Sequence, residues 1–268
     1  MEIKELQKIA KDLRRDIIEM IYRAKSGHPG GSLSIADIMA VLYWNEMNVD
    51  PANPKMENRD RFVLSKGHAA PALYASLIEK GYASKDLIPT LRRWHSPLQG
   101  HPDMKKLPGV EMSTGSLGQG LSAANGMAIS AKIYGNDYRV YAILGDGELQ
   151  EGQIWEAAMY AGGKGVDNLI ATVDYNQKQI DGPTDKVLPL GDLRAKWEAF
   201  GWQVIDIEKG NDIASILKGL ADAKALTGKG KPVCILLHSE MGNGVDFMMG
   251  THAWHGKAPN DEQLAKAL

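Results

Sequence analysis

Residues 139–148 read RVYAILGDGE, a short apolar run that ends in glycine, aspartate, glycine and glutamate. Three further apolar runs follow downstream, at residues 168–174, 203–207 and 232–238. Segments with helical spacing of apolar positions separate them, at 151–163, 193–200 and 213–226. Short buried strands that alternate with helices are typical of a parallel sheet covered on both faces. The sequence therefore predicts an α/β fold: a doubly wound, mostly parallel sheet with helices on both faces.

Helical spacing also occurs elsewhere in the chain, at residues 3–25, 34–47, 69–80 and 117–134. No linker rich in proline, serine or charge interrupts the pattern, and there is no low-complexity tract. We therefore expect residues 1–268 to form a single domain.

Composition excludes several classes of protein. The 31 Lys and Arg residues against 33 Asp and Glu leave a net charge of −2, so the chain lacks the basic field of a nucleic-acid-binding protein. The longest apolar runs, 140–144 and 233–237, are far shorter than a membrane span. The charged N-terminus does not resemble a secretory signal, and the single cysteine, Cys234, excludes an internal disulfide. We expect a cytoplasmic protein that binds neither nucleic acid nor membrane.

Polar side chains follow two consecutive predicted strands. Asp146 lies between Gly145 and Gly147, and Asn176 comes thirty residues later, after the next strand. Successive parallel strands are often neighbours, so both side chains could reach one ion. Carboxylate and amide oxygens suit Mg²⁺ or Ca²⁺, and the glycines would let the backbone approach a phosphate. The segment is interpreted as an anchor for a metal and a diphosphate, with a plain turn capped by Asp146 as the alternative.

Four of the seven histidines stand beside glycine: His28, His68, His101 and His255. Glycine turns expose the imidazole, which titrates near neutrality and suits proton transfer to hydroxyl or carbonyl oxygens. No pair has the i, i+4 spacing of a zinc-binding helix. The stretch 113–120, STGSLGQG, is a glycine-rich turn that opens a helix. It fits a loop that approaches a flat ring closely, with Leu117 as an apolar contact, although a plain helix start explains it equally well.

These segments together resemble the N-terminal, diphosphate-binding domain of transketolases. The matching motifs are SGHPGGS (26–32), SKGH (65–68), GHP (100–102), STGSLGQG (113–120), GDGELQEG (145–152), DYN (174–176) and WHGK (254–257). The resemblance extends over about residues 5–260. A GDG triplet with a downstream Asn is shared by many thiamine diphosphate enzymes, whereas the histidine motifs are more specific to transketolases.

The resemblance implies roles for individual residues. It places a divalent cation, Mg²⁺ or Ca²⁺, on Asp146, Asn176 and the backbone carbonyl of Lys178. It places thiamine diphosphate against Gly115, Ser116, Leu117, Gly145, Asp146, Gly147, Glu148, Asn176, His68 and His255. It gives sugar binding to His28, His101 and His255, and assigns catalysis to these three residues and His68. Glu151 matches an acid that helps to join two active-site halves, or it simply favours the first turn of a helix.

Transketolases built as one chain continue through a pyrimidine-binding domain and a third domain, which these residues do not include. The resemblance therefore implies either one subunit of a split transketolase or a truncated chain. For a split enzyme it implies a complementary C-terminal subunit in an α2β2 assembly, and sugar or sugar-phosphate substrates. The implied reaction transfers a two-carbon ketol unit from a ketose to an aldose, through a thiamine diphosphate-bound dihydroxyethyl intermediate, as in the pentose phosphate pathway.

Two alternatives stay open at this stage. The first is another thiamine diphosphate enzyme, such as a deoxyxylulose-phosphate synthase or the α-chain of a 2-oxo acid dehydrogenase. The second is a non-catalytic binding or regulatory subunit. One departure from the family also matters: residues 238–244 read HSEMGNG where transketolases usually carry a Lys-Gly-Lys-Gly stretch. The change puts selectivity for a phosphorylated sugar in doubt, unless it is drift in a solvated loop.

Overall fold

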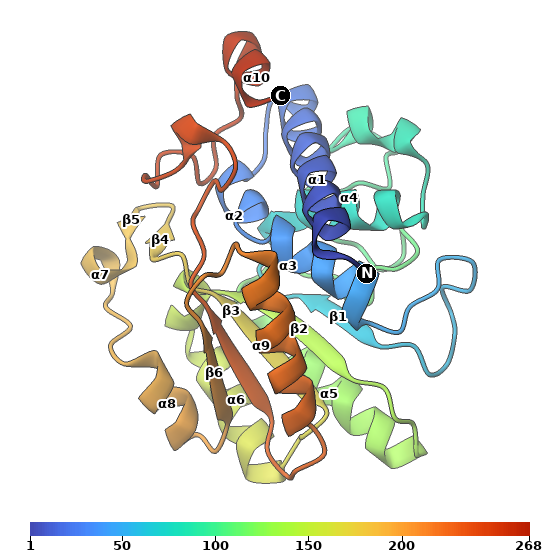
Figure 1. Ribbon diagram of the computed structural model, residues 1–268, viewed down its shortest axis with the longest axis vertical. Coiled ribbons are helices and arrows are strands. Elements are labelled where there is room, and N and C mark those ends of the chain that lie inside the picture. Colours follow the sequence, from blue (N-terminus) through green and yellow to red (C-terminus); the bar gives the residue numbers. More distant parts are fainter.

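The computed structural model describes residues 1–268, and its centre is a five-stranded parallel sheet (Figure 1). The strands, in the spatial order β1-β2-β3-β7-β6, are β1 (Arg61–Leu64), β2 (Val140–Gly145), β3 (Leu169–Asp174), β7 (Val233–Leu237) and β6 (Gln203–Ile207). All four neighbouring pairs are parallel. The predicted α/β fold is confirmed, and the four predicted strands are present.

Helices cover both faces of the sheet. On one face the core joins the sheet to α1 (Ile3–Ala24), α3 (Ala36–Val41), α4 (Ala70–Lys80) and α9 (Ile213–Leu226), of which α9 lies directly on β6 and β7. The other face packs against α5 (Gln119–Tyr134), α6 (Gly152–Lys164) and α8 (Leu193–Ala199). In Figure 1, α9 lies in front of the sheet, and α5 and α6 lie behind it. Neighbouring residues of β3 point to opposite layers, Ile170 to the first and Ala171 to the second, as the two-residue period of a strand requires.

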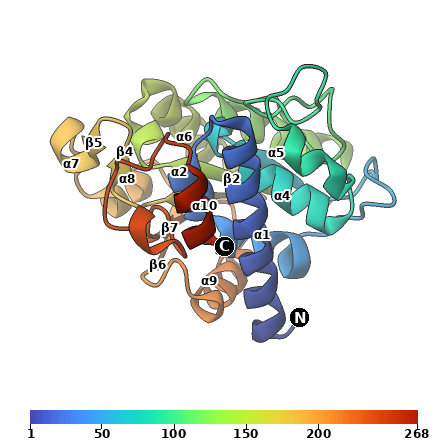
Figure 2. The same cartoon turned by 90° about the horizontal axis from the view of Figure 1, so that it is seen from above.

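Shorter elements complete the chain. The helices are α2 (Pro29–Leu33), α7 (Thr184–Val187), α10 (Asp261–Ala267), a π-helical turn (Leu42–Glu46) and 3₁₀ turns at Gly67–Ala69, Lys85–Thr90, Gly147–Gln150 and Asp246–Met248. A small hairpin joins β4 (Lys178–Gln179) to β5 (Gly182–Pro183). Figures 1 and 2 both place α10 beside α1. No helix combines the length and the apolar character needed to cross a membrane.

The prediction missed one strand, and one expected helix was wrong. Strand β1 was not predicted, because its four residues, RFVL, are too few to display a period. The single helix expected over 34–47 is broken. The Ser34 hydroxyl lies 3.1 Å from the Gly31 carbonyl oxygen and 2.7 Å from Asp174 Oδ2, which competes with regular helix hydrogen bonding. Pro29 instead opens α2, and a new helix begins at Ala36.

The contact between α1 and α4 contains a titratable pair. Burial, and then the neighbouring Glu79, raise the pKa of Asp16 from 3.8 to about 7. The folded state therefore keeps a proton that the unfolded chain releases, so this carboxyl destabilises the fold increasingly as the pH rises from about 4 to 7. Asp16→Asn is expected to raise Tm at about pH 8 by a few degrees, equivalent to roughly 1 kcal/mol after solvent screening, with little effect near pH 4. Thermal unfolding at both pH values checks this, and an equal shift at both would contradict it.

Candidate active site

The carboxyl ends of β2 and β3 form the floor of the site. Gly145 pairs with Asp174 in the parallel register, so the segments that follow these two residues emerge side by side. Asp146 Oδ1 accepts a hydrogen bond from the Gly147 amide at 2.8 Å, and its Oδ2 accepts one from the Gln177 amide. The structure thus brings the Asp146 and Asn176 segments together, as expected for consecutive strands.

The electrostatics of this floor fit a bound cation. Asp146 is only 2% exposed, and burial, followed by the charge of Asp174, raises its pKa to about 7. The nearby cation Lys66 pairs with Asp174 and not with Asp146. Asp146 is therefore a buried carboxylate without an ion-pair partner, and a divalent cation held by oxygen atoms would compensate it.

A cavity of about 110 Å³ opens above this floor. It is lined by Gly31, Lys66, His68, Leu117, Gly145, Asp146, Gly147, Glu148, Asp174, Asn176, Lys178, Gln179, Ile180, Met241 and His255. Nine of these residues were expected at the cofactor or metal site. The others, including Lys66 and Asp174, were not assigned a role from the sequence.

Three of the four singled-out histidines converge beside the cavity. The ring centroid of His28 lies 5.0 Å from that of His68 and 5.5 Å from that of His255, and His68 and His255 are 5.3 Å apart. Burial, reinforced by neighbouring positive charges, lowers the pKa of His28 and of His255 to about 4 and holds that of His68 well below its usual range. All three rings are therefore neutral near pH 7. The Nδ1 atoms of His28 and His255 are buried without a hydrogen-bond partner, which is uncommon for buried polar atoms outside functional sites.

His101 lies outside this triplet, against the glycine-rich turn. A Cβ added to Gly115 would come within 2.9 Å of the His101 ring, and Gly115 has a φ of +145°, so only glycine suits this position. Burial and then the charge of Arg92 lower the pKa of His101. Ser116 in this turn is exposed, and so is Glu151 at the N-cap of α6. His28, His101, Gly115, Ser116 and Glu151 do not line the 110 Å³ cavity.

Glu148 lines the cavity, and both of its carboxylate oxygens also accept hydrogen bonds from within the chain. Its Oε1 accepts hydrogen bonds from the Ser65 hydroxyl at 2.5 Å and the Gly118 amide at 2.9 Å, and its Oε2 accepts one from the Gly145 amide at 3.0 Å. Both oxygens are thus occupied by the chain itself. Glu148 ties the end of β1, the start of α5 and the end of β2 together, which is a positioning role.

A second buried carboxylate organises the wall of the cavity. Asp174 Oδ2 accepts hydrogen bonds from Lys66 Nζ at 2.6 Å, Ser34 Oγ at 2.7 Å and Asn176 Nδ2 at 2.9 Å. Its Oδ1 accepts a further one from the Ser239 hydroxyl. This network orients Asn176 and joins four chain segments. Sequence reasoning missed it, although both Lys66 and Asp174 lie within quoted motifs, SKGH and DYN.

The unusual stretch 238–244 makes contacts within the chain. Its Glu240 Oε1 lies 3.2 Å from Lys178 Nζ and accepts a hydrogen bond from the Gly250 amide at 2.8 Å. Met241 packs on the turn at Gly30, where an added Cβ would approach Met241 Cγ to 2.7 Å. The stretch is therefore an ordered wall of the site and not a freely solvated loop.

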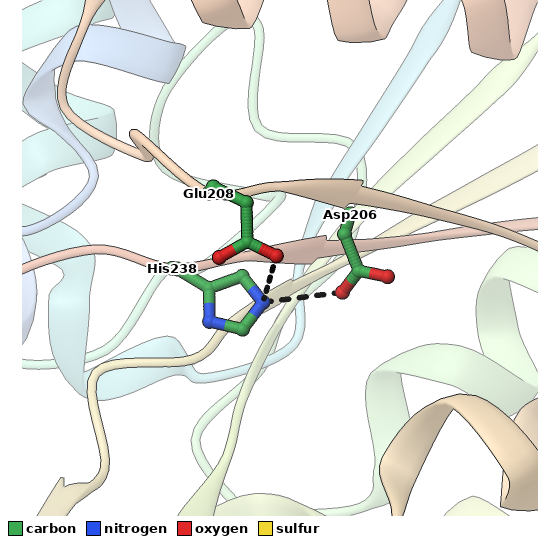
Figure 3. Close-up of side chains that lie close together, drawn as sticks. All are labelled: Asp206, Glu208 and His238. Atoms are coloured by element: carbon green, nitrogen blue, oxygen red, sulfur yellow. Dashed lines mark hydrogen bonds and ion pairs between the residues drawn. The ribbon is translucent and has the colours of Figure 1, made fainter.

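Figure 3 shows the side chain of His238 turned toward Asp206 and Glu208. His238 Nε2 lies 3.1 Å from Asp206 Oδ1 and 4.0 Å from Glu208 Oε1. These three residues have metal-binding side chains, but Arg194 already forms an ion pair with Asp206 and Glu208 is largely exposed. The cluster is explained by the Arg194–Asp206 ion pair, beside which His238 lies at the ends of β6 and β7.

Comparison with known proteins supports the family assignment. Residues 5–267 match the family described as transketolase, thiamine diphosphate binding domain. The chain is 46% identical over 264 residues to the 6-deoxy-6-sulfo-D-fructose transketolase subunit of Clostridium sp. (strain MSTE9), covering 98% of this chain and 95% of the relative. It is 41% identical over 268 residues to one of the apulose-4-phosphate transketolase subunits of Phocaeicola vulgatus, covering 100% of this chain and 94% of the relative.

Single-chain transketolases are also similar, but they are longer. The crystal structure of transketolase from Campylobacter jejuni superposes with a TM-score of 0.93 at 37% identity, covering 100% of this chain and 42% of that one. Human transketolase is 38% identical over 268 residues, which is 42% of its length. The chain thus belongs to the transketolase family, in which it represents the N-terminal, thiamine diphosphate-binding part, as its motifs predicted.

Proposed function

We propose that this chain is the cofactor-anchoring subunit of a split transketolase and transfers a two-carbon ketol unit only together with a complementary C-terminal chain. The observation that carries the proposal is the fraction of each relative's length that this chain covers. The chain covers 94–95% of two transketolase subunits but only 42% of human transketolase. The pyrimidine-binding and C-terminal domains are accordingly assigned to the partner, in an α2β2 assembly within the cytoplasm.

The residues of the cavity fit thiamine diphosphate and a divalent cation. Asp146, Asn176 and the Lys178 carbonyl would hold Mg²⁺ or Ca²⁺, and Gly145 and Gly147 would let the backbone approach the diphosphate closely. When bound, thiamine diphosphate would stabilise negative charge on a carbon atom of the substrate. Leu117 and the Gly115 turn would contact its rings, and His68 and His255 its diphosphate and reactive side.

The chain itself would contribute general acid–base catalysis by histidines beside the cofactor. His28 and His255 are neutral near pH 7 because of burial, so each ring can accept a proton from a sugar hydroxyl or return one to an oxygen. His28, His101 and His255 would bind the sugar near its C1 and C2 oxygens. Glu148 and Asp174 hold the loops that carry these groups and do not themselves exchange protons with substrate.

The relatives indicate the substrate class. Two of them are named for 6-deoxy-6-sulfo-D-fructose and for apulose 4-phosphate, and both sugars carry a strong anion in addition to their hydroxyl groups. We propose a ketose with such an anion as donor. A pentose-phosphate substrate belongs to the same class, whereas pyruvate, the donor of a deoxyxylulose-phosphate synthase, does not.

Reconstitution tests the proposal. We combine the chain with the complementary C-terminal chain encoded in the same genome, and add Mg²⁺ and thiamine diphosphate. The assay measures two-carbon transfer from sulfonated and phosphorylated ketoses to an aldose. Activity is expected only when both chains are present. Product from pyruvate but none from any ketose would reject the transketolase assignment, and no activity with any donor would support a non-catalytic subunit.

One face of the chain suits the partner. On α5 and α6 the apolar side chains of Ile133 and Met159 are 71% and 61% exposed, and a hollow of about 360 Å³ runs between the two helices, past Gly126 and Tyr160. Both helices begin beside the active site, at Gln119 and Gly152. A partner seated here would therefore also cover the cofactor.

Gly126→Arg is expected to weaken assembly at least tenfold while the isolated chain folds normally, because a Cβ at Gly126 meets nothing within 4 Å but a bulky charge would disrupt an apolar interface. Analytical ultracentrifugation with the partner measures the effect. Ala221→Arg on the opposite layer, also at an exposed helical position, is the control. Equal assembly of the two variants would place the interface elsewhere.

A further inference from the structure

The cofactor cavity is lined by two lysines that have unlike surroundings. Lys66 is 2% exposed, and its Nζ lies 2.6 Å from Asp174 Oδ2 and 2.7 Å from the Gly31 carbonyl oxygen. The side chain of Lys178 is 19% exposed, and its Nζ lies 3.2 Å from Glu240 Oε1. The charge of Lys66 is therefore compensated inside the protein, whereas Lys178 carries its charge where water and a ligand can reach it.

The ion pair between Lys178 and Glu240 is loose. The Glu240 side chain is 40% exposed, and an ion pair that water reaches contributes little to stability. Glu240 Oε1 also accepts a hydrogen bond from the Gly250 amide at 2.8 Å, and the Glu240 amide donates to Asn211 Oδ1 at 2.8 Å. Glu240 thus keeps its position without the lysine, while the flexible stem of Lys178 lets its ammonium turn toward another anion.

Little else in the cavity can neutralise a bound diphosphate, which is a multiply charged anion. The lining contains three acids against the two lysines, and its two histidines are neutral near pH 7 because burial lowers the pKa of each. The stretch 238–244 has no lysine or arginine, and it contributes Met241 to the wall. Since Lys66 is bound to a buried carboxylate, Lys178 is the one cationic side chain of the lining that is free to meet the diphosphate.

We propose that the Lys178 side chain binds the diphosphate of the cofactor, so that one residue serves the anion through its ammonium and the divalent cation through its backbone carbonyl. The inference rests on the proposed function and adds a cofactor-binding side chain to it. An ammonium is a compact donor for phosphate oxygens, and here it replaces the positive charge that residues 238–244 lack. Glu240 holds the ammonium before the cofactor arrives and then competes with the diphosphate for it.

Isothermal titration of the two reconstituted chains with thiamine diphosphate at saturating Mg²⁺ tests the inference. Lys178→Met removes the ammonium but keeps the backbone carbonyl, and we expect it to weaken cofactor binding about 20-fold, as for the loss of a charge-assisted hydrogen bond. Lys178→Arg should recover most of the affinity. Lys186→Met is the control, because Lys186 is 79% exposed on α7 and lies outside the cavity. Native affinity in Lys178→Met would overturn the inference.

Glu240→Gln distinguishes this role from that of a structural ion pair. A structural ion pair predicts the same loss of cofactor affinity when either partner is replaced. A competing Glu240 predicts instead that Glu240→Gln binds the cofactor at least as tightly as the native enzyme. The double variant Lys178→Met/Glu240→Gln should match Lys178→Met alone, because Glu240 acts only through the lysine. Equal weakening in the two single variants would contradict the inference.

None of these measurements requires catalysis, and circular dichroism and Tm establish that each variant folds. Enzyme that binds thiamine diphosphate as expected but transfers no two-carbon unit would reject the proposed function and leave the role of Lys178 standing. Native enzyme that fails to bind thiamine diphosphate would overturn the role of Lys178.

Discussion

Asp146→Ala is expected to abolish Mg²⁺-dependent binding of thiamine diphosphate, with an affinity loss of at least 100-fold and a folded chain. The expectation follows from burial: Asp146 is 2% exposed and has no cationic side-chain partner, so its charge is available to a divalent ion. Removing it deletes the anionic ligand from the proposed site, while the Asn176 amide and the Lys178 carbonyl alone bind hard cations weakly. Isothermal titration of the reconstituted pair with cofactor at fixed Mg²⁺ measures the loss.

The control for Asp146→Ala is Asp181→Ala. Asp181 lies in the β4–β5 hairpin close in sequence to the site and is exposed, so this variant removes the same charge without touching the cavity. Circular dichroism and Tm establish that both variants fold. Burial, followed by the charge of Asp174, raises the pKa of Asp146 to about 7, so its charge stabilises the fold little, but alanine also leaves the Gly147 and Gln177 amides without their acceptor. We therefore expect a folded chain with a modestly lower Tm in the absence of metal. Native cofactor affinity in Asp146→Ala would reject the assigned cation site.

Gly67→Ala is expected to damage cofactor binding by a purely steric route. A Cβ at this position would come within 2.6 Å of the Gly115 amide nitrogen and 2.8 Å of the Thr114 carbonyl carbon. Both contacts are with backbone, so the turn carrying Gly115 and the segment carrying His68 must move apart. Overpacking of this kind costs about 1–3 kcal/mol, and we expect a 10- to 100-fold weaker affinity for thiamine diphosphate together with a lower Tm.

Gly152→Ala provides the comparison for Gly67→Ala. Gly152 opens α6, and a Cβ there meets nothing within 4 Å, so alanine should leave Tm unchanged or slightly higher. Differential scanning calorimetry and cofactor titration of both variants separate a local clash from a general intolerance of glycine replacement. If Gly67→Ala binds cofactor as the native protein does, the close approach of the two segments is not needed for the site.

The sheet and the edge that carries Asp146 and Asn176 were predictable because they depend on local order along the chain. Asp146 and Asn176 follow strands separated by one crossover, and such strands are usually neighbours. Adjacency of their carboxyl ends therefore follows from chain order alone. Strand β1 was not found in this way, since four residues carry too little periodicity, and it is this strand that delivers Lys66 and His68 to the site.

The histidine cluster could not be derived from spacing. His28, His68 and His255 come from segments far apart in sequence, and only resemblance to transketolases indicated that they belong together. The Lys66–Asp174 pair escaped notice for a related reason: a lysine and an aspartate are usually solvated, and their burial becomes apparent only when four segments are assembled around them. The hydrogen bonds that Glu148 of the GDGE turn accepts from Ser65, Gly118 and Gly145 were also not predictable, because these three residues come together only in the folded chain.

The network around Asp174 has a consequence for how a two-chain enzyme is put together. The buried carboxylate of Asp174 accepts hydrogen bonds from the segments that follow β1, β3 and β7 and from the turn after α2. All of these donors are side chains of this polypeptide. These four segments of the pocket are consequently joined to one another before the second polypeptide docks. Little conformational freedom remains to be lost at that step, so a modest contact area can produce a durable complex.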